Sequence, residues 1–288
     1  MINLNITAKQ LINICKSSRT VKLRVFGNKR IILKKFDEFS KKSFNSIKFL
    51  ENVNNKNFSL KNFKNNLIIS QKKIDINLRN NCLVIFENPR FLFSFLIKKL
   101  FKLSDNENFF NSNDLKSIKH YRDKNINFGD NVILNKNTII MHNSKIDHGT
   151  VIGKSGLAVS FFKKKSYSFP HIGRVKIGKN CYIGSNCVIM RGMITNTLIG
   201  NNCSIGNLVN IGHNVKIGNN VTISSGTMIA GGSSIGDNSV ISLGSKINEK
   251  IKIGKNCFVG IGSVVTKSFN ANSKIFGNPA YKYGSEKI

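Results

Sequence analysis

Apolar residues recur at every sixth position through the C-terminal half of the chain. Twelve consecutive positions of this phase are aliphatic, and glycine often follows them. An amphipathic strand has a period of two and a helix a period of 3.6, so neither accounts for this spacing. A parallel β-helix whose turns have three flat, six-residue faces does account for it. The twelve positions are Ile199, Ile205, Ile211, Ile217, Ile223, Ile229, Ile235, Ile241, Ile247, Ile253, Val259 and Val265.

One histidine, His213, lies inside this run, and Gly231 follows it by eighteen residues. In a β-helix with three six-residue faces, residues eighteen apart stack about 4.8 Å from each other, which is one strand spacing. We therefore expect the imidazole of His213 beside the backbone of Gly231. A base next to an N–H group that no side chain covers is the arrangement that acyl transfer requires.

The six-residue period begins at Phe128, breaks over residues 153–171, and shortens slightly around Met193 to Leu198. The break is an aromatic and basic insertion. It could cover a cleft, touch a membrane or form a solvated loop, and its residues leave these alternatives open. The side chains concerned are Phe161, Phe162, Lys163, Lys164, Lys165 and Tyr167.

Residues 1–103 show no six-residue period and combine short β-like runs with one clear helix. Asn88 can cap that helix and Pro89 suits its first turn, so its apolar face is expected to pack on a sheet. The sequence predicts a small α/β domain over 1–103, a polar linker over 104–120, the β-helix over 121–270, and an exit loop and tail over 271–288.

The formal net charge is +31. Biased use of Asn, Lys and Ile explains much of it, and the rest suits phosphates on a substrate, an acidic carrier protein or a membrane surface. The lysines belong to no recognised nucleic-acid module, so no nucleic-acid partner is expected.

Six cysteines occur without Cys-x-x-Cys spacing, so we expect no metal site. Cys181, Cys187, Cys203 and Cys257 each follow an isoleucine by four residues, the slot for a small inward side chain. They are predicted to be buried structural thiols. The N-terminus resembles no signal peptide, and no apolar run approaches about 18 residues, so we expect a cytoplasmic protein, free or peripheral at the inner face of the inner membrane.

Four segments together resemble the UDP-3-O-(3-hydroxyacyl)glucosamine N-acyltransferase family of lipid A biosynthesis. Ile47-Lys-Phe-Leu-Glu-Asn52 is similar to its uridine-pocket motif, and residues 82–95 to the element that ends its uridine-binding domain. Residues 171–186 and 207–218 are similar to its β-helix over most positions. The resemblance covers nearly the whole chain and implies a left-handed β-helix of hexapeptide repeats and a homotrimer.

The family transfers a 3-hydroxyacyl group from acyl carrier protein to the 2-amino group of a UDP-linked, 3-O-acylated glucosamine, without a permanently bound cofactor. The resemblance implies that His213 is the general base and that the Gly231 N–H stabilises the oxyanion. It implies that Asn207 meets substrate across a trimer cleft, that Phe49 stacks on uracil and that Asn52 binds its edge. The alternatives are a plain turn residue for Asn207, which fits almost as well, and a core residue beside a loop Asn for Phe49.

Three positions depart from the family pattern. Asn55 stands where the family has a second uracil-stacking Tyr, and Met190 where it has an Asp. Lys250 stands where it has a second active-site His. A lysine there could contact a phosphate or the phosphopantetheine arm, but it does not repeat imidazole proton chemistry at neutral pH.

Three functions are compatible with the sequence. The first is the lipid A-type N-acyltransferase. The alternative is an acetyl-CoA-dependent acetyltransferase acting on another nucleotide-linked amino sugar, which the short C-terminus and the turn Gly277-Asn-Pro-Ala280 favour. The third is a trimeric scaffold or nucleic-acid binder, which only the charge and the missing carboxylate at Met190 favour.

Overall fold

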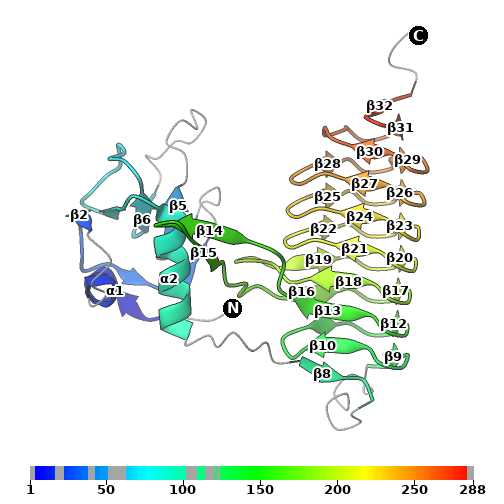
Figure 1. Cartoon of the computed structure of the whole chain (residues 1–288), viewed down its shortest axis with the longest axis horizontal. Helices are drawn as coiled ribbons and strands as arrows, with labels where there is room; N and C mark the ends of the chain where they lie inside the picture. Colours follow the sequence, from blue (N-terminus) through cyan, green and yellow to red (C-terminus); the bar gives the residue numbers. More distant parts are fainter. Residues whose placement is uncertain are drawn as a thin grey trace. The chain divides into compact units, whose positions relative to one another are not determined.

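A computed structural model describes residues 4–16, 23–37, 43–50, 63–101, 109–113, 121 and 124–283. The chain divides into two compact units. The first consists of Met1–Asp105 with Leu157–Pro170, and the second of Asn106–Gly156 with His171–Ile288 (Figure 1). Neither helix of the described residues is long and apolar enough to span a membrane.

The first unit contains a five-stranded sheet in the order β2-β7-β6-β5-β4. Neighbouring strands from β4 to β7 are parallel, and only β2 is antiparallel to its neighbour. The carboxyl ends of β5, β6 and β7 therefore meet at one edge, where open α/β sheets bind ligands. The strands are β2 (Arg24–Gly27), β4 (Lys35–Phe36), β5 (Ser46–Leu50), β6 (Leu67–Ser70) and β7 (Cys82–Ile85).

Two helices and a small antiparallel pair, β1 (Ile6–Thr7) with β3 (Ile32–Leu33), complete the main body of this unit. The helices are α1 (Ala8–Lys16) and α2 (Pro89–Phe101). Asn88 caps α2, because its Oδ1 accepts a hydrogen bond of 2.8 Å from the Phe91 N–H. The apolar side of α2 packs on β5 and β6, so the expected helix and its packing are confirmed.

The insertion forms a hairpin of the first unit, β14 (Val159–Phe162) with β15 (Lys165–Ser168). The Phe162 ring stacks on Phe91 of α2 with centroids 4.3 Å apart, and is buried there. The solvated-loop alternative is therefore wrong for this segment, since burying the aromatic ring holds the hairpin on the helix. Phe161, by contrast, is exposed.

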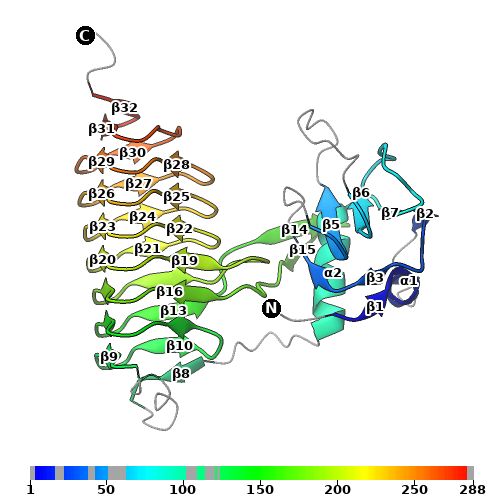
Figure 2. The ribbon, with the colours of Figure 1, turned by 180° about the vertical axis from the view of Figure 1, so that it is seen from behind.

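The second unit is a left-handed β-helix with three faces, and the stacked strands of each face are mainly parallel (Figure 2). The first face contains β8 (Phe109–Asn111), β10 (Ile133–Asn135), β13 (Val151–Lys154), β18 (Val188–Met190), β21 (Asn210–Ile211), β24 (Met228–Ile229), β27 (Lys246–Ile247) and β30 (Val264–Val265). The second face contains β11 (Ile139–Ile140), β16 (Val175–Ile177), β19 (Thr197–Ile199), β22 (Lys216–Ile217), β25 (Ser234–Ile235) and β28 (Lys252–Ile253). The third contains β9 (Asn127–Phe128), β12 (Lys145–Ile146), β17 (Tyr182–Ile183), β20 (Ser204–Ile205), β23 (Thr222–Ile223), β26 (Val240–Ile241), β29 (Phe258–Val259), β31 (Lys274–Gly277) and β32 (Ala280–Lys282).

The aliphatic ladder forms the core of the β-helix. Ile211 pairs with Ile229 and Ile229 with Ile247, eighteen residues apart each time, and all three are buried. The four cysteines predicted to point inward are also buried. The six-residue period therefore arises because each coil presents one aliphatic side chain per face to a continuous interior.

The ends of the β-helix differ from the sequence expectation. Residues 104–120, expected to be a linker, include β8, which pairs antiparallel with β10. Residues beyond 270, expected to be an exit loop, include β31, which continues the third face by pairing with β29. Both strands satisfy backbone groups that a terminal coil would otherwise leave without partners.

Asparagines line the corner between the second and third faces. They have φ near +55° to +60°, a conformation that Asn tolerates better than most residues. Each side-chain amide donates to the amide oxygen of the next, at 3.0 to 3.2 Å. The high Asn content is therefore partly structural. The ladder consists of Asn180, Asn202, Asn220, Asn238, Asn256 and Asn272.

Apart from the coil that carries the insertion, one coil is longer than the regular eighteen residues. Asn180 and Asn202 are bonded across 22 residues, whereas Asn202 and Asn220 are bonded across 18. The sequence interpretation of a shortened repeat around Met193 to Leu198 is therefore wrong, because this coil carries four additional residues. They lie between β18 and β19, where they bulge from the corner without changing the strand register.

Candidate active site

The corner between the first and second faces collects the irregular features of the β-helix, and we call it the His213 corner. It contains the departure and return points of the insertion, Gly156 and His171, and the long loop 191–196. Above that loop lie the turns that carry His213 and Gly231. Away from this corner the coils turn with regular six-residue spacing up to Val265, and only the last coil is shorter, with Val259 paired to Ile275.

His213 and Gly231 stack as predicted. The Gly232 N–H donates to the His213 carbonyl at 2.8 Å. A Cβ atom placed on Gly231 would lie 2.6 Å from His213 Nε2, so this ring nitrogen faces the Gly231 backbone. The Gly231 N–H donates no hydrogen bond to any described residue. A reactive carbonyl between the two groups would meet a base and a hydrogen-bond donor together.

Asn214 holds the other side of the imidazole. Its Oδ1 lies 3.1 Å from His213 Nδ1 and accepts a hydrogen bond of 2.9 Å from the Met193 N–H. Its Nδ2 donates to the Thr195 hydroxyl at 2.8 Å and to the Thr195 carbonyl at 3.1 Å. The long loop below therefore contacts the residue that orients His213.

A second histidine, His171, lies beside His213, and sequence reasoning missed it. The two ring centroids are 5.6 Å apart in an edge-to-face arrangement, and His171 is buried. A Cβ on Gly156 would lie 3.2 Å from His213 Cδ2 and from Met190 Sδ, so all four residues meet. The six-residue period is interrupted just before His171, so counting positions did not predict that it lies beside His213. That His171 is the first residue after the insertion was the one sequence feature that pointed to it.

Lys250 also lies at the His213 corner, above Gly232. Its N–H donates to the Gly231 carbonyl at 3.0 Å, and its Cγ would be 3.4 Å from a Cβ on Gly232. Its ammonium group forms an ion pair of 3.0 Å with Glu249, and both side chains are largely exposed. The proposed contact with a phosphate stays a prediction.

Asn207 lies at a different corner, between the third and first faces. Its Oδ1 accepts a hydrogen bond of 2.9 Å from the Ser185 N–H, and its own N–H donates to the Ser225 hydroxyl at 3.0 Å. Within one chain it is therefore a turn residue and does not adjoin His213. A role opposite another copy stays a prediction.

Phe49 lies in the first unit, in an aromatic cluster. Its ring centroid is 4.7 Å from that of Phe93 in α2 and 6.2 Å from that of Phe169. Asn52 and Asn55 lie outside the described residues. Phe49 has the contacts of a half-buried core residue, and the uracil contact expected of it stays a prediction.

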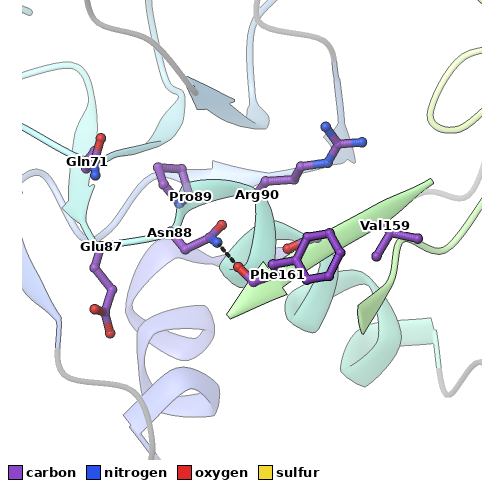
Figure 3. A pocket seen from close by; sticks show the side chains of 8 residues that line it. Gln71, Glu87, Asn88, Pro89, Arg90, Val159 and Phe161 are labelled. Atoms are coloured by element: carbon purple, nitrogen blue, oxygen red, sulfur yellow. Dashed lines mark hydrogen bonds between the residues drawn. The ribbon is translucent and has the colours of Figure 1, made fainter. Parts of the chain in front are cut away.

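A cavity of about 330 Å³ opens in the same unit, beyond the carboxyl ends of β6 and β7 (Figure 3). A hydrogen bond of 2.7 Å from Asn88 Nδ2 to the Phe161 carbonyl joins the start of α2 to the hairpin across it. Polar groups and one aromatic ring therefore line a space at the edge where open α/β sheets commonly bind ligands. The lining residues are Gln71, Glu87, Asn88, Pro89, Arg90, Val159, Ser160 and Phe161.

Two family models match the β-helix. The bacterial transferase hexapeptide (six repeats) matches residues 196–231, and the hexapeptide repeat of succinyl-transferase matches residues 174–194 and 250–268. No curated protein matches the chain.

Solved structures with a similar fold include the UDP-N-acetylglucosamine acyltransferase of Francisella novicida, which is 24% identical over 53% of this chain and 58% of its own, with a TM-score of 0.43. The Campylobacter jejuni enzyme of the same name is 21% identical over 55% and 68%, with a TM-score of 0.45. The acetyltransferase domain of PglB from Neisseria gonorrhoeae is 16% identical over 52% and 57%, with a TM-score of 0.35. The chain thus spans less than three fifths of the Francisella and Neisseria chains.

Proposed function

We propose that this chain, whose repeats are those of hexapeptide transferases, moves a (3-hydroxy)acyl group from acyl carrier protein to the 2-amino group of a UDP-linked acylated glucosamine in lipid A biosynthesis. The observation that carries the proposal is the approach of His213 Nε2 to Gly231, where a glycine leaves room and its N–H has no described acceptor. The rings of His148 and His171 also lie against glycines, but a Cβ on Gly129 would meet carbon atoms of the His148 ring, and a Cβ on Gly156 would lie farther, 3.3 Å, from His171 Nε2.

The reaction follows from these two groups. As the amine nitrogen attacks the thioester carbonyl, Nε2 of His213 takes the amine proton. The carbonyl oxygen becomes an oxyanion, which the Gly231 N–H stabilises by a hydrogen bond. When the C–S bond breaks, the imidazolium returns the proton to the departing sulfur, so the products are an amide and a free thiol.

Three other features support the proposed acceptor and donor. The cavity next to α2 supports a nucleotide-sugar subsite in the first unit. Phe49 and Asn52, which are not among its lining residues, stay the predicted uracil contacts. Lys250, in the His213 corner, is a suitable partner for a phosphate of the sugar nucleotide or of the phosphopantetheine arm. The net charge of +31 suits an acidic carrier protein and a peripheral position at the cytoplasmic membrane surface.

A homotrimer is part of the proposal. The outward positions of the first face, next to the His213 corner, include the apolar Val151, Val188 and Met228, with Asn210 between the last two, and Met228 is 55% exposed. Apolar side chains on one flat face favour burial against another copy. Such packing could bring Asn207 of one chain to the His213 corner of another.

The test compares the wild type with His213→Ala, using acylated UDP-glucosamine as acceptor and 3-hydroxyacyl carrier protein or acetyl-CoA as donor. Mass spectrometry of the product identifies the acyl group. We expect product from the carrier donor, and a loss of about 10²-fold or more in His213→Ala. His142→Ala, which changes an exposed histidine at another corner, is the matched control. Near-normal turnover of His213→Ala would refute the role of His213 as general base. Acylation with acetyl-CoA but not with 3-hydroxyacyl carrier protein would show that acetyl-CoA is the donor.

A further inference from the structure

The four additional residues of the long coil lie directly below the turn that carries His213, and they are anchored on both sides. Below, the Ile172 N–H donates to the Met193 carbonyl at 2.8 Å and the Gly173 N–H to the Gly192 carbonyl at 3.0 Å. Above, Met193 and Thr195 contact the side chain of Asn214. We call residues 190–197 the brace.

The brace also holds the backbone of Asn214. The Asn214 N–H donates to the Thr197 hydroxyl at 2.9 Å, and that hydroxyl donates to the Met190 carbonyl at 2.7 Å. Thr197 is fully buried, so this connection is shielded from water. Gly192 completes the turn, because a Cβ there would lie 3.0 Å from Asn214 Nδ2 and would collide with the Thr195 carbonyl. Main chain and side chain of Asn214 are thus both tied to the brace.

These contacts determine which way the Asn214 amide points. The Met193 N–H can only donate, so it needs the amide oxygen opposite it. The Thr195 carbonyl can only accept, so it needs the amide NH₂ group. A flipped amide would place donor against donor and acceptor against acceptor. The oxygen must therefore face His213 Nδ1, at 3.1 Å.

From this geometry we infer that the brace, through Thr195 and Asn214, fixes His213 in the tautomer that carries its proton on Nδ1 and leaves the Nε2 lone pair directed at Gly231. An amide oxygen can only accept, so Nδ1 must donate. Nε2 is then the only ring nitrogen able to take a proton. Asn214 and Thr195 are positioning residues, because they act through His213.

The inference rests on the proposed function only for its catalytic meaning, since the tautomer is a property of the protein without substrate. Histidines labelled with ¹⁵N are observed by long-range ¹H–¹⁵N correlation at about pH 8, where imidazole is neutral. The His213 signals are identified by their loss in His213→Gln. We compare the wild type with Asn214→Leu, Thr195→Val and Thr195→Ser. Thr227→Val, which removes a buried hydroxyl at another corner, is the matched control.

We expect the Nδ1–H tautomer in the wild type, in Thr195→Ser and in Thr227→Val, and a shift to Nε2–H in Asn214→Leu. Thr195→Val loses one of the hydrogen bonds that orient the amide, which should shift the tautomer ratio about 5-fold. Acyl transfer by Asn214→Leu should fall about 10²-fold in kcat with KM little changed, as when a base is held in the wrong tautomer.

The Nε2–H form in the wild type, or an unchanged tautomer in Asn214→Leu, would overturn the inference. Either result leaves the proposed function intact, which is tested by His213→Ala alone. Conversely, if the protein does not catalyse the proposed acyl transfer, the spectra still report the tautomer of His213. If Asn214→Leu does not fold, the wild-type spectrum and the Thr195→Val and Thr195→Ser pair still decide between the outcomes.

Discussion

Adding one methyl group at Gly231 should separate catalysis from stability. The Cβ of Gly231→Ala would lie 2.6 Å from His213 Nε2 and 2.7 Å from Cε1. Ordinary contact between such atoms needs about 3.5 Å, so the imidazole must retreat by about 1 Å. The Gly231 backbone does not have positive φ, and alanine can adopt its conformation. The main cost to folding is the weakened hydrogen bond of His213, about 1 kcal/mol.

The effect on the reaction is larger. A base displaced by about 1 Å loses about 10²-fold in rate, and the methyl group also occupies the space that the reacting carbonyl needs. We therefore expect the acyl-transfer rate of Gly231→Ala to fall about 10²-fold. Thiol release from the donor measures that rate, and chemical denaturation measures the free energy of unfolding.

The neighbouring glycine provides the control. Gly232 has φ of +73°, and a Cβ there meets only Lys250 Cγ at 3.4 Å, which is ordinary contact. Gly232→Ala should cost about 1 to 2 kcal/mol in backbone strain, similar to or above the cost at Gly231, yet keep a near-normal rate. If Gly231→Ala reacts within about 3-fold of the wild type, or if both variants lose rate in proportion to stability, the reacting centre does not lie between His213 and Gly231.

Two further predictions concern the scaffold. Asn220→Val removes the amide hydrogen bonds to Asn202 and Asn238 and puts a β-branched residue at φ of +55°. Thermal unfolding should therefore show a loss of about 2 to 3 kcal/mol in the free energy of unfolding, and Asn220→Gly should lose less. Equal losses in the two variants would contradict the argument from backbone conformation. Burial raises the pKa of Cys15 to about 12 and that of Cys82 to about 11, so both thiols should stay unreacted towards a disulfide reagent at pH 8 until the protein unfolds; rapid labelling of either in the native state would contradict it.

The repeats were predictable because their information is local. Each six-residue unit supplies one face, so a position eighteen residues away along the chain is also the position one strand spacing away in space. The aliphatic ladder, the buried cysteines and the stacking of His213 with Gly231 all follow from counting. The capped helix α2 was predictable for a similar reason, because Asn88, Pro89 and its apolar side lie within a single segment.

Counting fails wherever the chain leaves the repeat. His171, the first residue after the insertion, lies next to His213 although it is 42 positions earlier in the chain, and the additional residues of the brace were misread as a shortened repeat. The pattern also did not predict the hairpin that the insertion forms, since Phe162 is buried against α2, about 70 positions earlier in the chain. The position of the hairpin depends on which surface buries its aromatic ring, and the six-residue period of the sequence contains no information about that surface.

The sequence by itself therefore determined the β-helix, its register and the pair formed by His213 and Gly231, because regular backbone geometry converts spacing into position. Only the tertiary structure decided that His171 is a neighbour of His213 and that Asn214 is oriented by Met193 and Thr195. Those relations arise from irregular loops and side-chain hydrogen bonds across the corner. Their donors and acceptors meet only after the coils have stacked.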